Sequence, residues 1–156
     1  MKRYYLAYGS NLNVRQMQAR CPGARIIGTT EIPNYELLFK GSKTGAYLTI
    51  EKRDGSVVPG AVWETTEKHE ASLDCYEGCP FFYYKTEMEL PVKLSQNGKT
   101  ERLPVYVYIM HEDRKLGVPS PDYVETCFEG YADFDLPDDI LWTAVKEAWG
   151  LDYEDE

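Results

Sequence analysis

The feature that most constrains the fold is a regular alternation of side chains from Phe82 to Leu94. Apolar or small side chains occupy every second position, which is typical of a β-strand with one buried face. The positions assigned to the other face begin with Tyr83, Lys85, Glu87 and Glu89. Asn97-Gly98 follows, and this pair is a strong signal for a tight hairpin turn. The chain is therefore expected to return as a second strand.

Further strands and helices are indicated by turn residues, capping residues and apolar periodicity. The returning strand spans Leu103 to Met110, and the other predicted strands are Arg3 to Ala7, Arg25 to Glu31, Tyr35 to Lys40, Ala46 to Glu51 and Val57 to Glu64. The predicted helices run from Asn13 to near Arg20, from Thr66 to about Glu77, from Ser120 to about Tyr131, and from Pro137 onward. Strands come first and helices last, which favours an α+β domain with a small closed or highly curved sheet. We expect a single domain over residues 1–150 and an acidic tail over 151–156.

Charge and cysteine content narrow the function classes. The 156 residues carry 17 basic and 26 acidic side chains, a formal charge of −9. Such a chain is repelled by phosphate backbones and anionic lipids, so nucleic acid and membrane surfaces are not expected partners. No signal peptide or spanning segment is apparent, which predicts a cytoplasmic protein with reduced cysteines. Cys75 and Cys79 lack a second cysteine pair, so no metal site is expected.

The first segment with chemical potential is Tyr8-Gly9-Ser10-Asn11, at the junction of a predicted strand and helix. Gly9 lets a ligand approach the backbone, and successive N–H groups in such a turn can converge on an anion. A ligand bearing a carboxylate would suit this turn. An ordinary strand-to-helix connection would have the same sequence.

The second segment is Leu73-Asp74-Cys75-Tyr76-Glu77-Gly78, which places Glu77 at the end of a predicted helix. The negative end of the helix dipole and the nearby Asp74 both raise the pKa of this glutamate. A carboxyl with a raised pKa suits general acid–base catalysis at neutral pH. A solvated glutamate before a glycine cap is the alternative.

A third segment, Pro119-Ser120-Pro121-Asp122-Tyr123, presents the Tyr123 hydroxyl either to a ligand or to water.

Four motifs in this order resemble the γ-glutamylcyclotransferase-like, or AIG2-like, family. They are Ala7-Tyr8-Gly9-Ser10-Asn11-Leu12, Gly60-Ala61-Val62-Trp63, Leu73-Asp74-x-x-Glu77-Gly78 and Pro119-Ser120-Pro121-x-Tyr123. The resemblance spans about Arg3 to Tyr131. It implies a small mixed β-barrel flanked by helices, and an enzyme that needs neither metal nor cofactor. The implied reaction is the cyclisation of a γ-glutamyl amide, which gives 5-oxoproline and a free amine or amino acid.

The resemblance also implies roles for individual residues. Glu77 corresponds to the glutamate that accepts a proton from the substrate's α-ammonium group and returns one to the leaving nitrogen. The γ-glutamyl group is held by the turn and the strand before it, and by one tyrosine, which here are Tyr5, Leu6, Ala7, Tyr8, Gly9, Ser10, Asn11 and Tyr123.

Two branches of the family share features with this chain. The turn resembles the branch that acts on γ-glutamyl amino acids, whereas Glu77-x-Cys79-Pro80-x-x-Tyr83-x-Lys85 resembles the γ-glutamylamine branch. That branch often has Arg where this chain has Lys85, and Lys cannot make the planar bidentate contact of Arg. Tyr83 and Lys85 are therefore weaker candidates for substrate contacts. The sequence does not assign the identity of the amine that is released.

Two alternatives accompany the enzyme hypothesis. The same fold and pocket would suit a non-catalytic module that binds a carboxylated metabolite or a partner protein. A different acyl-transfer or hydrolysis reaction in the same pocket would release free glutamate instead of a cyclic product. The sequence does not specify the oligomeric state.

Overall fold

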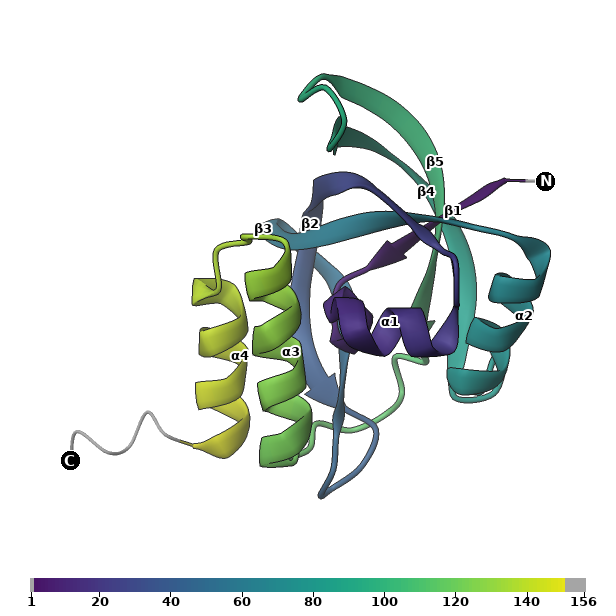
Figure 1. The fold of residues 1–156 in the computed structure, drawn as a ribbon. Helices are drawn as coiled ribbons and strands as arrows, with labels where there is room; N and C mark the ends of the chain where they lie inside the picture. The colour runs from purple at the N-terminus through teal and green to yellow at the C-terminus, as the bar shows by residue number, and fades with distance from the viewer. Residues whose placement is uncertain (1, 151–156) are drawn as a thin grey trace.

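A closed five-stranded barrel forms the centre of the molecule (Figure 1). This computed structural model describes residues 2–150, so the predicted acidic tail at 151–156 lies outside the described residues. The strands are adjacent in the order β1, β3, β2, β4 and β5. Their bounds are β1 Arg3–Ala7, β2 Arg25–Lys40, β3 Tyr47–Thr65, β4 Tyr83–Leu94 and β5 Thr100–Met110. The predicted α+β barrel is confirmed.

The helices surround the barrel on different sides (Figure 1). In this view α3 and α4 lie side by side on one side, α2 lies on the opposite side, and α1 lies between them. A short 3-10 helix, η1, precedes α1 and was not predicted. The bounds are η1 Ser10–Leu12, α1 Val14–Arg20, α2 Glu67–Tyr76, α3 Pro121–Asp133 and α4 Asp139–Trp149. Among the described residues, no helix is both long enough and apolar enough to cross a membrane.

Three predicted capping residues begin their helices as expected. The side chain of Asn13 accepts a hydrogen bond from the Gln16 backbone N–H at 3.1 Å. Thr66 and Ser120 make the corresponding bonds, at 3.3 and 3.2 Å, to backbone N–H groups three residues later. These bonds satisfy N–H groups that have no partner within the helix, so each helix start is fixed locally.

The long β2–β3 hairpin corrects the sequence prediction of four separate strands. Residues 25–31 and 35–40 belong to β2, and residues 46–51 and 57–64 belong almost entirely to β3. An irregularity interrupts the register between Pro33 and Tyr35, where Asn34 has a φ of 62°. The Asn34 side chain accepts a hydrogen bond from the Gly55 N–H at 3.0 Å. The turn-forming residues therefore make a bulge within one hairpin, because pairing resumes on both sides of it.

The β4–β5 hairpin confirms the Asn97-Gly98 turn and corrects one face assignment. Tyr83 was predicted on the exposed face of its strand, yet it is buried. Its hydroxyl donates to the Leu48 carbonyl at 2.8 Å, so the ring is held inside the barrel end. Farther along β4, Leu90 and Val92 are buried and Glu89 is exposed, as the alternation predicts.

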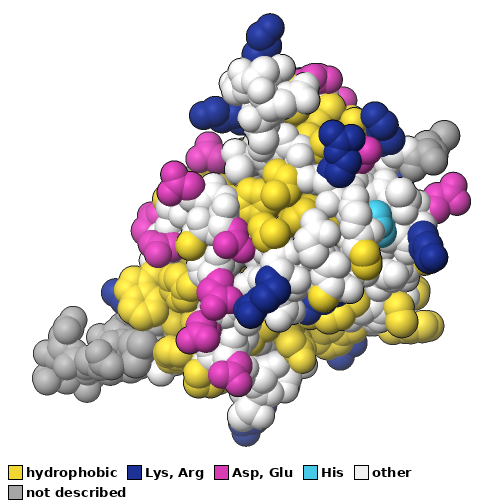
Figure 2. Space-filling model, viewed as in Figure 1, with side chains coloured by type: hydrophobic (Ala, Val, Ile, Leu, Met, Phe, Trp, Pro, Cys, Tyr) yellow, Lys and Arg dark blue, Asp and Glu magenta, His cyan; other side chains and the backbone are white. Residues whose placement is uncertain are grey.

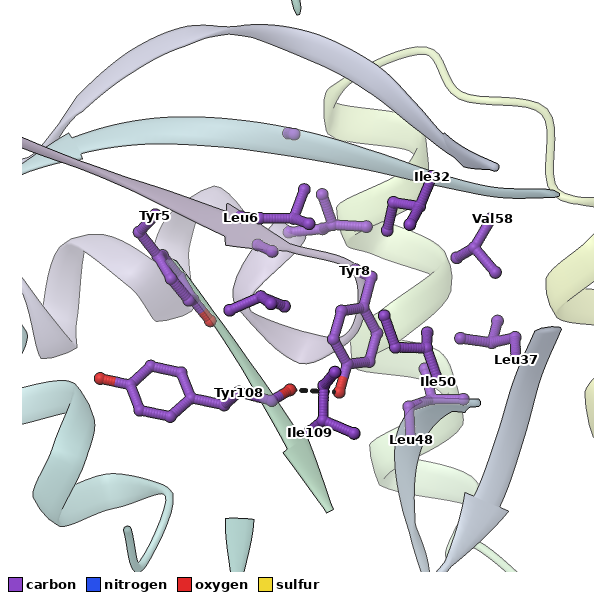
Figure 3. Packing of buried hydrophobic residues seen from close by; sticks show 14 of the residues in the cluster. Tyr5, Leu6, Tyr8, Ile32, Leu37, Leu48, Ile50, Val58, Tyr108 and Ile109 are labelled. Carbon is purple, nitrogen blue, oxygen red and sulfur yellow. Dashed lines mark hydrogen bonds between the residues drawn. The ribbon is translucent and has the colours of Figure 1, made fainter. Parts of the chain in front are cut away.

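Strand β1 closes the barrel by pairing on both edges. It pairs antiparallel with β3 and parallel with β5, where Tyr5 is opposite Tyr106. Figure 3 shows Tyr5 and Tyr8 extending from this segment toward Tyr108, while Leu6 lies among aliphatic core side chains. The end of β1 therefore connects the hydrophobic core to the aromatic end of the barrel.

Acidic side chains gather over the side of the molecule that carries α3 and α4 (Figure 2). Exposed Glu125, Glu129 and Asp133 of α3 contribute to this surface. These carboxylates are thus displayed to solvent on a helical face.

Gly130 allows α3 to lie against η1. A Cβ atom built at this position would be 2.5 Å from the Asn13 backbone nitrogen and 2.8 Å from the Leu12 Cβ atom. Alanine normally favours a helix over glycine by about 1 kcal/mol. We nevertheless expect Gly130→Ala to lower the free energy of unfolding by about 1–3 kcal/mol, because overpacking displaces well-packed backbone. Urea unfolding will measure this change, and a gain in stability would contradict the packing argument.

Candidate functional site

A cavity of about 170 Å³ opens at the end of the barrel where β1 stops. Its walls come from β1, the turn after it, the start of β3, the end of α2, the starts of β4 and α3, and β5. The lining residues are Tyr5, Tyr8, Gly9, Ser10, Asn11, Tyr47, Leu48, Tyr76, Glu77, Phe82, Tyr83, Tyr108 and Tyr123. The cavity therefore joins segments that lie far apart in the sequence.

Most of the predicted site residues meet at this cavity. The turn from Tyr8 to Asn11 lines the cavity together with Glu77 and Tyr123. Tyr5 and Tyr83 also line it. Three predicted residues do not. Leu6 and Ala7 are fully buried in the core, and Lys85 points to acidic residues outside the cavity.

Glu77 is the C-cap of α2, directly before Gly78, which has a φ of 64°. Gly78 adopts the left-handed conformation that ends a helix, so the chain turns sharply after the glutamate. Burial raises the pKa of Glu77 to about 7, while the positive charge of Arg20 acts in the opposite direction. Desolvation disfavours the charged carboxylate, so proton exchange occurs near neutral pH.

The expected contribution of Asp74 to this raised pKa is not found. Asp74 accepts a hydrogen bond from Tyr108 at 2.6 Å and pairs with Lys85 at 3.0 Å. Lys85 also pairs with Glu70 at 2.7 Å. The charge of Asp74 is therefore balanced by Lys85, and burial is the main cause of the Glu77 shift. These contacts also fasten α2 to β4 and β5, which carry Lys85 and Tyr108.

The turn after β1 lines the cavity with Gly9, Ser10 and Asn11. Gly9 precedes the 3-10 helix, whose first hydrogen bond runs from the Leu12 N–H to the Gly9 carbonyl at 3.0 Å. The N–H groups at the start of a helix have no partner within it, so those of Ser10 and Asn11 are suited to a ligand. A Cβ atom on Gly9 would lie 3.4 Å from the Leu48 side chain and 3.6 Å from the Tyr123 hydroxyl.

Four tyrosine hydroxyls are held in fixed positions around the cavity. Asn11 donates to the Tyr5 hydroxyl at 2.9 Å, and Tyr8 donates to the Tyr108 carbonyl at 2.7 Å (Figure 3). Tyr83 and Tyr123 form hydrogen bonds with the backbone of Leu48. The Leu48 carbonyl accepts from the Tyr83 hydroxyl, and the Leu48 N–H donates to the Tyr123 hydroxyl at 3.1 Å.

These tyrosines stay neutral at physiological pH. Burial raises the pKa of Tyr5, Tyr8, Tyr83 and Tyr123 well above the usual value, and the charge of Glu77 adds to the effect. They can therefore orient a ligand by hydrogen bonding, while Glu77 is the lining residue suited to proton exchange near pH 7.

Five cavity residues were missed by sequence reasoning: Tyr47, Leu48, Tyr76, Phe82 and Tyr108. Tyr76 could have been found as the neighbour of Glu77, and Tyr108 as the cross-strand partner of Lys85. Tyr47 and Tyr76 are 44% and 47% exposed, so they form part of the cavity mouth. The positions of Tyr47, Leu48 and Phe82 at the cavity depend on strand register, which the sequence does not show directly.

The charge at the cavity is concentrated in one group. Among the described residues that line it, Glu77 is the one with an ionisable carboxyl, and none is Lys, Arg or His. Residues 2–150 contain no group of three or more His, Cys, Asp or Glu arranged to hold a metal ion. The lining residues can thus supply a proton acceptor, backbone N–H donors and neutral phenols.

Comparisons with known proteins identify a family. The family model described as "Gamma-glutamyl cyclotransferase, AIG2-like" matches residues 5–125. The chain is 30% identical to the γ-glutamylcyclotransferase of Bos taurus over 143 residues, covering 85% of this chain and 72% of the bovine protein. It is also 30% identical to the Homo sapiens protein of that name over 141 residues, with the same coverage.

Solved structures agree with the sequence matches. A structure named γ-glutamyl cyclotransferase is 25% identical and superposes with a TM-score of 0.78, covering 88% of this chain and 82% of the other. An uncharacterized protein from Homo sapiens is 29% identical, with a TM-score of 0.77 and coverage of 87% and 82%.

Proposed function

Because the chain belongs to the AIG2-like γ-glutamyl cyclotransferase family, we propose that it cyclises γ-glutamyl amides. The products are 5-oxoproline and a free amine or amino acid. The observation that carries the proposal is the placement of Glu77, with a pKa of about 7, in one cavity with the backbone turn from Tyr8 to Asn11. A base and a set of N–H donors in one small cavity are what this reaction requires.

The proposed reaction begins with proton transfer to Glu77. The carboxylate accepts a proton from the substrate's α-ammonium group, and the resulting amine attacks the γ-carbonyl carbon. The new C–N bond closes a five-membered ring, and the negative charge moves to the former carbonyl oxygen. Holding the two reacting groups together avoids a bimolecular encounter, which lowers the barrier by roughly 7–11 kcal/mol in well-oriented systems.

The second half of the reaction breaks the original amide bond. The Glu77 carboxyl gives its proton to the leaving nitrogen, and the carboxylate so formed accepts the proton that the positively charged ring nitrogen loses. The C–N bond to the leaving nitrogen then breaks, and the negatively charged oxygen reforms the ring carbonyl. The released amine takes the last proton from Glu77, which returns Glu77 to its carboxylate form. Atoms and charges balance without an added reactant.

We assign substrate binding to the turn and to neutral tyrosines. The Ser10 and Asn11 N–H groups are suited to the substrate carboxylate or the developing oxyanion, as is expected where a backbone turn meets a helix start. Tyr5 and Tyr123 are held with their hydroxyls near this turn, by Asn11 and by the Leu48 backbone respectively. Leu6 and Ala7 support the turn from the core, and Lys85 supports α2.

The proposed function is tested by incubating the purified protein with γ-glutamyl amino acids, γ-glutamylamines and other γ-glutamylated small molecules. Release of 5-oxoproline, detected by mass spectrometry, is the expected result. Free glutamate in place of the cyclic product would indicate hydrolysis. Calorimetric binding of 5-oxoproline without turnover of any substrate would favour a non-catalytic binding module.

We expect a methyl group at Gly9 to interfere with substrate. Gly9→Ala would direct a Cβ atom toward Leu48 and Tyr123, into the space beside the turn. Displacing a substrate by a fraction of an ångström spoils its reacting geometry, so kcat/KM should fall on the order of 10-fold or more. Steady-state kinetics with the preferred γ-glutamyl substrate measures this, with the melting temperature as the control for folding. Unchanged kcat/KM would exclude close approach of the substrate at Gly9.

A further inference from the structure

Arg20 is the last residue of α1 and connects two walls of the cavity. Its Nη1 atom donates to the Asn11 side-chain oxygen, and its Nη2 atom donates to the Tyr76 hydroxyl at 2.6 Å. The guanidinium carbon lies 3.7 Å from the centre of the Tyr76 ring. Asn11 belongs to the proposed binding turn and Tyr76 directly precedes Glu77, so one side chain fixes both.

The partners of Arg20 are neutral. A third hydrogen bond, 2.7 Å long, joins Nη2 to the Gln16 side-chain oxygen within α1. None of the ion pairs in the described part of the chain includes Arg20, whereas Arg3, Arg15, Arg53 and Arg102 each have at least one. Arg20 is half-buried beside the cavity. Its positive charge is therefore held in place without being neutralised by a carboxylate of its own.

We propose that Arg20 is a positioning residue for the reaction assigned above: its planar fork fixes Asn11 and Tyr76, and its charge is the counter-charge that Glu77 faces when it ionises. This inference rests on the proposed function for its kinetic part only. An arginine suits the task because its donors are rigidly arranged and it stacks well on an aromatic ring.

The other titratable groups around Glu77 are neutral when it exchanges its proton. They include Tyr5, Tyr8, Tyr83, Tyr108, Tyr123 and Cys79, whose pKa values are all raised by burial. Asp74, one turn earlier on α2, is paired with Lys85. Arg20 also acts to lower the pKa of Glu77, against the larger effect of burial. Removing its charge should thus make Glu77 a weaker acid.

Three variants separate the charge of Arg20 from its geometry. Arg20→Met removes both, Arg20→Lys keeps the charge but loses the fork, and Arg15→Met is the matched control. Arg15 lies on the same helix, is 76% exposed and pairs with Glu129. Arg20→Gln replaces Arg20→Met if the latter does not fold.

The first readout is the titration of Glu77 itself, followed by carbon NMR of protein labelled with ¹³C-carboxyl glutamate. The Glu77 signal is the one absent from Glu77→Gln. We expect Arg20→Met to raise its midpoint by about one pH unit, as is usual for loss of a nearby opposite charge. Arg20→Lys and Arg15→Met should leave it close to the parent value. An unchanged midpoint in Arg20→Met, or an equal shift in Arg15→Met, would overturn the electrostatic role.

The second readout is kinetic. Arg20→Met and Arg20→Lys should each lower kcat/KM about 10-fold or more, because neither holds Asn11 and Tyr76 in place. Only Arg20→Met should also move the acid limb of the pH profile upward. Full activity of Arg20→Lys would overturn the positioning role. If no γ-glutamyl substrate is turned over, the proposed function fails, but the NMR titration still decides whether Arg20 acts on Glu77.

Discussion

Glu77→Gln is expected to lower kcat by on the order of 10²–10⁴-fold, the usual contribution of a positioned acid–base group. The amide retains the size of the carboxyl but cannot take a proton from the α-ammonium group or return one to the leaving nitrogen. Binding of 5-oxoproline should persist, since the turn from Tyr8 to Asn11 is unchanged. Steady-state kinetics and calorimetry on the same preparation distinguish the two effects.

Glu67→Gln is the matched control for this change. Glu67 is an exposed residue in the first turn of the same helix, so the substitution removes the same charge from α2 at a distance from the cavity. Its kcat should equal that of the parent protein.

In the parent, kcat/KM should rise with pH through about 7, because the base form of Glu77 is the form that accepts a proton. Undiminished turnover by Glu77→Gln would reject the assigned role.

Glu77→Gln should also make the protein more stable above neutral pH. The pKa of Glu77 is about 7 in the folded protein, against an ordinary value of 4.5. Between these values the folded state retains a proton that the unfolded state has released, so stability falls as pH rises through this window. A shift of that size corresponds to about 3 kcal/mol lost by the parent above pH 7. Glutamine does not titrate and avoids this loss.

Urea unfolding of both proteins at several pH values measures the effect. The free energy of unfolding of Glu77→Gln, relative to the parent, should increase by about 3 kcal/mol between pH 4.5 and pH 8. Other titrating groups are common to both proteins, so their contributions cancel in the difference. Glu67→Gln should show little such trend. A difference that is constant with pH would mean that the Glu77 carboxyl is well solvated in the folded protein.

Short local motifs predicted the part of the site that lies within continuous segments. The turn from Tyr8 to Asn11 and the Glu77-Gly78 helix end were visible because glycine and capping residues have strong local preferences. The hairpin at Asn97-Gly98 was predictable for the same reason. Local preferences do not specify which segments come together at one end of the barrel. The expectation that these segments share one site therefore came from the resemblance to a family.

The residues that could not be predicted owe their position to tertiary contacts. Tyr83 follows an alternation that assigns it to solvent, but the Leu48 carbonyl supplies a buried partner for its hydroxyl. Lys85 was a candidate for substrate contact and instead meets Glu70 and Asp74 of α2. In each case the strand was predicted correctly, and a contact with another element, β3 for Tyr83 and α2 for Lys85, determined where the side chain lies.

The long hairpin shows a different limit of sequence reasoning. Gly55 and the residues near Asn34 are common in turns, so the sequence predicts strand ends at both places. In the structure they lie opposite each other, and one hydrogen bond joins them within a continuous hairpin. A turn signal identifies where the backbone departs from regular geometry, but the facing strand determines whether pairing stops there.

The position of β1 between β3 and β5 has a consequence for how the protein folds. The partners of this first strand are residues 61–65 and Tyr106, so they leave the ribosome long after it does. Until they are available, Tyr5 and Leu6 have no sheet to join, and the cavity has neither its turn nor its closed end. Pairing between such distant segments forms late, because the entropy of closing long loops must be overcome first. Catalytic competence should therefore arise with the last strand pairings of the barrel rather than within any early folded fragment.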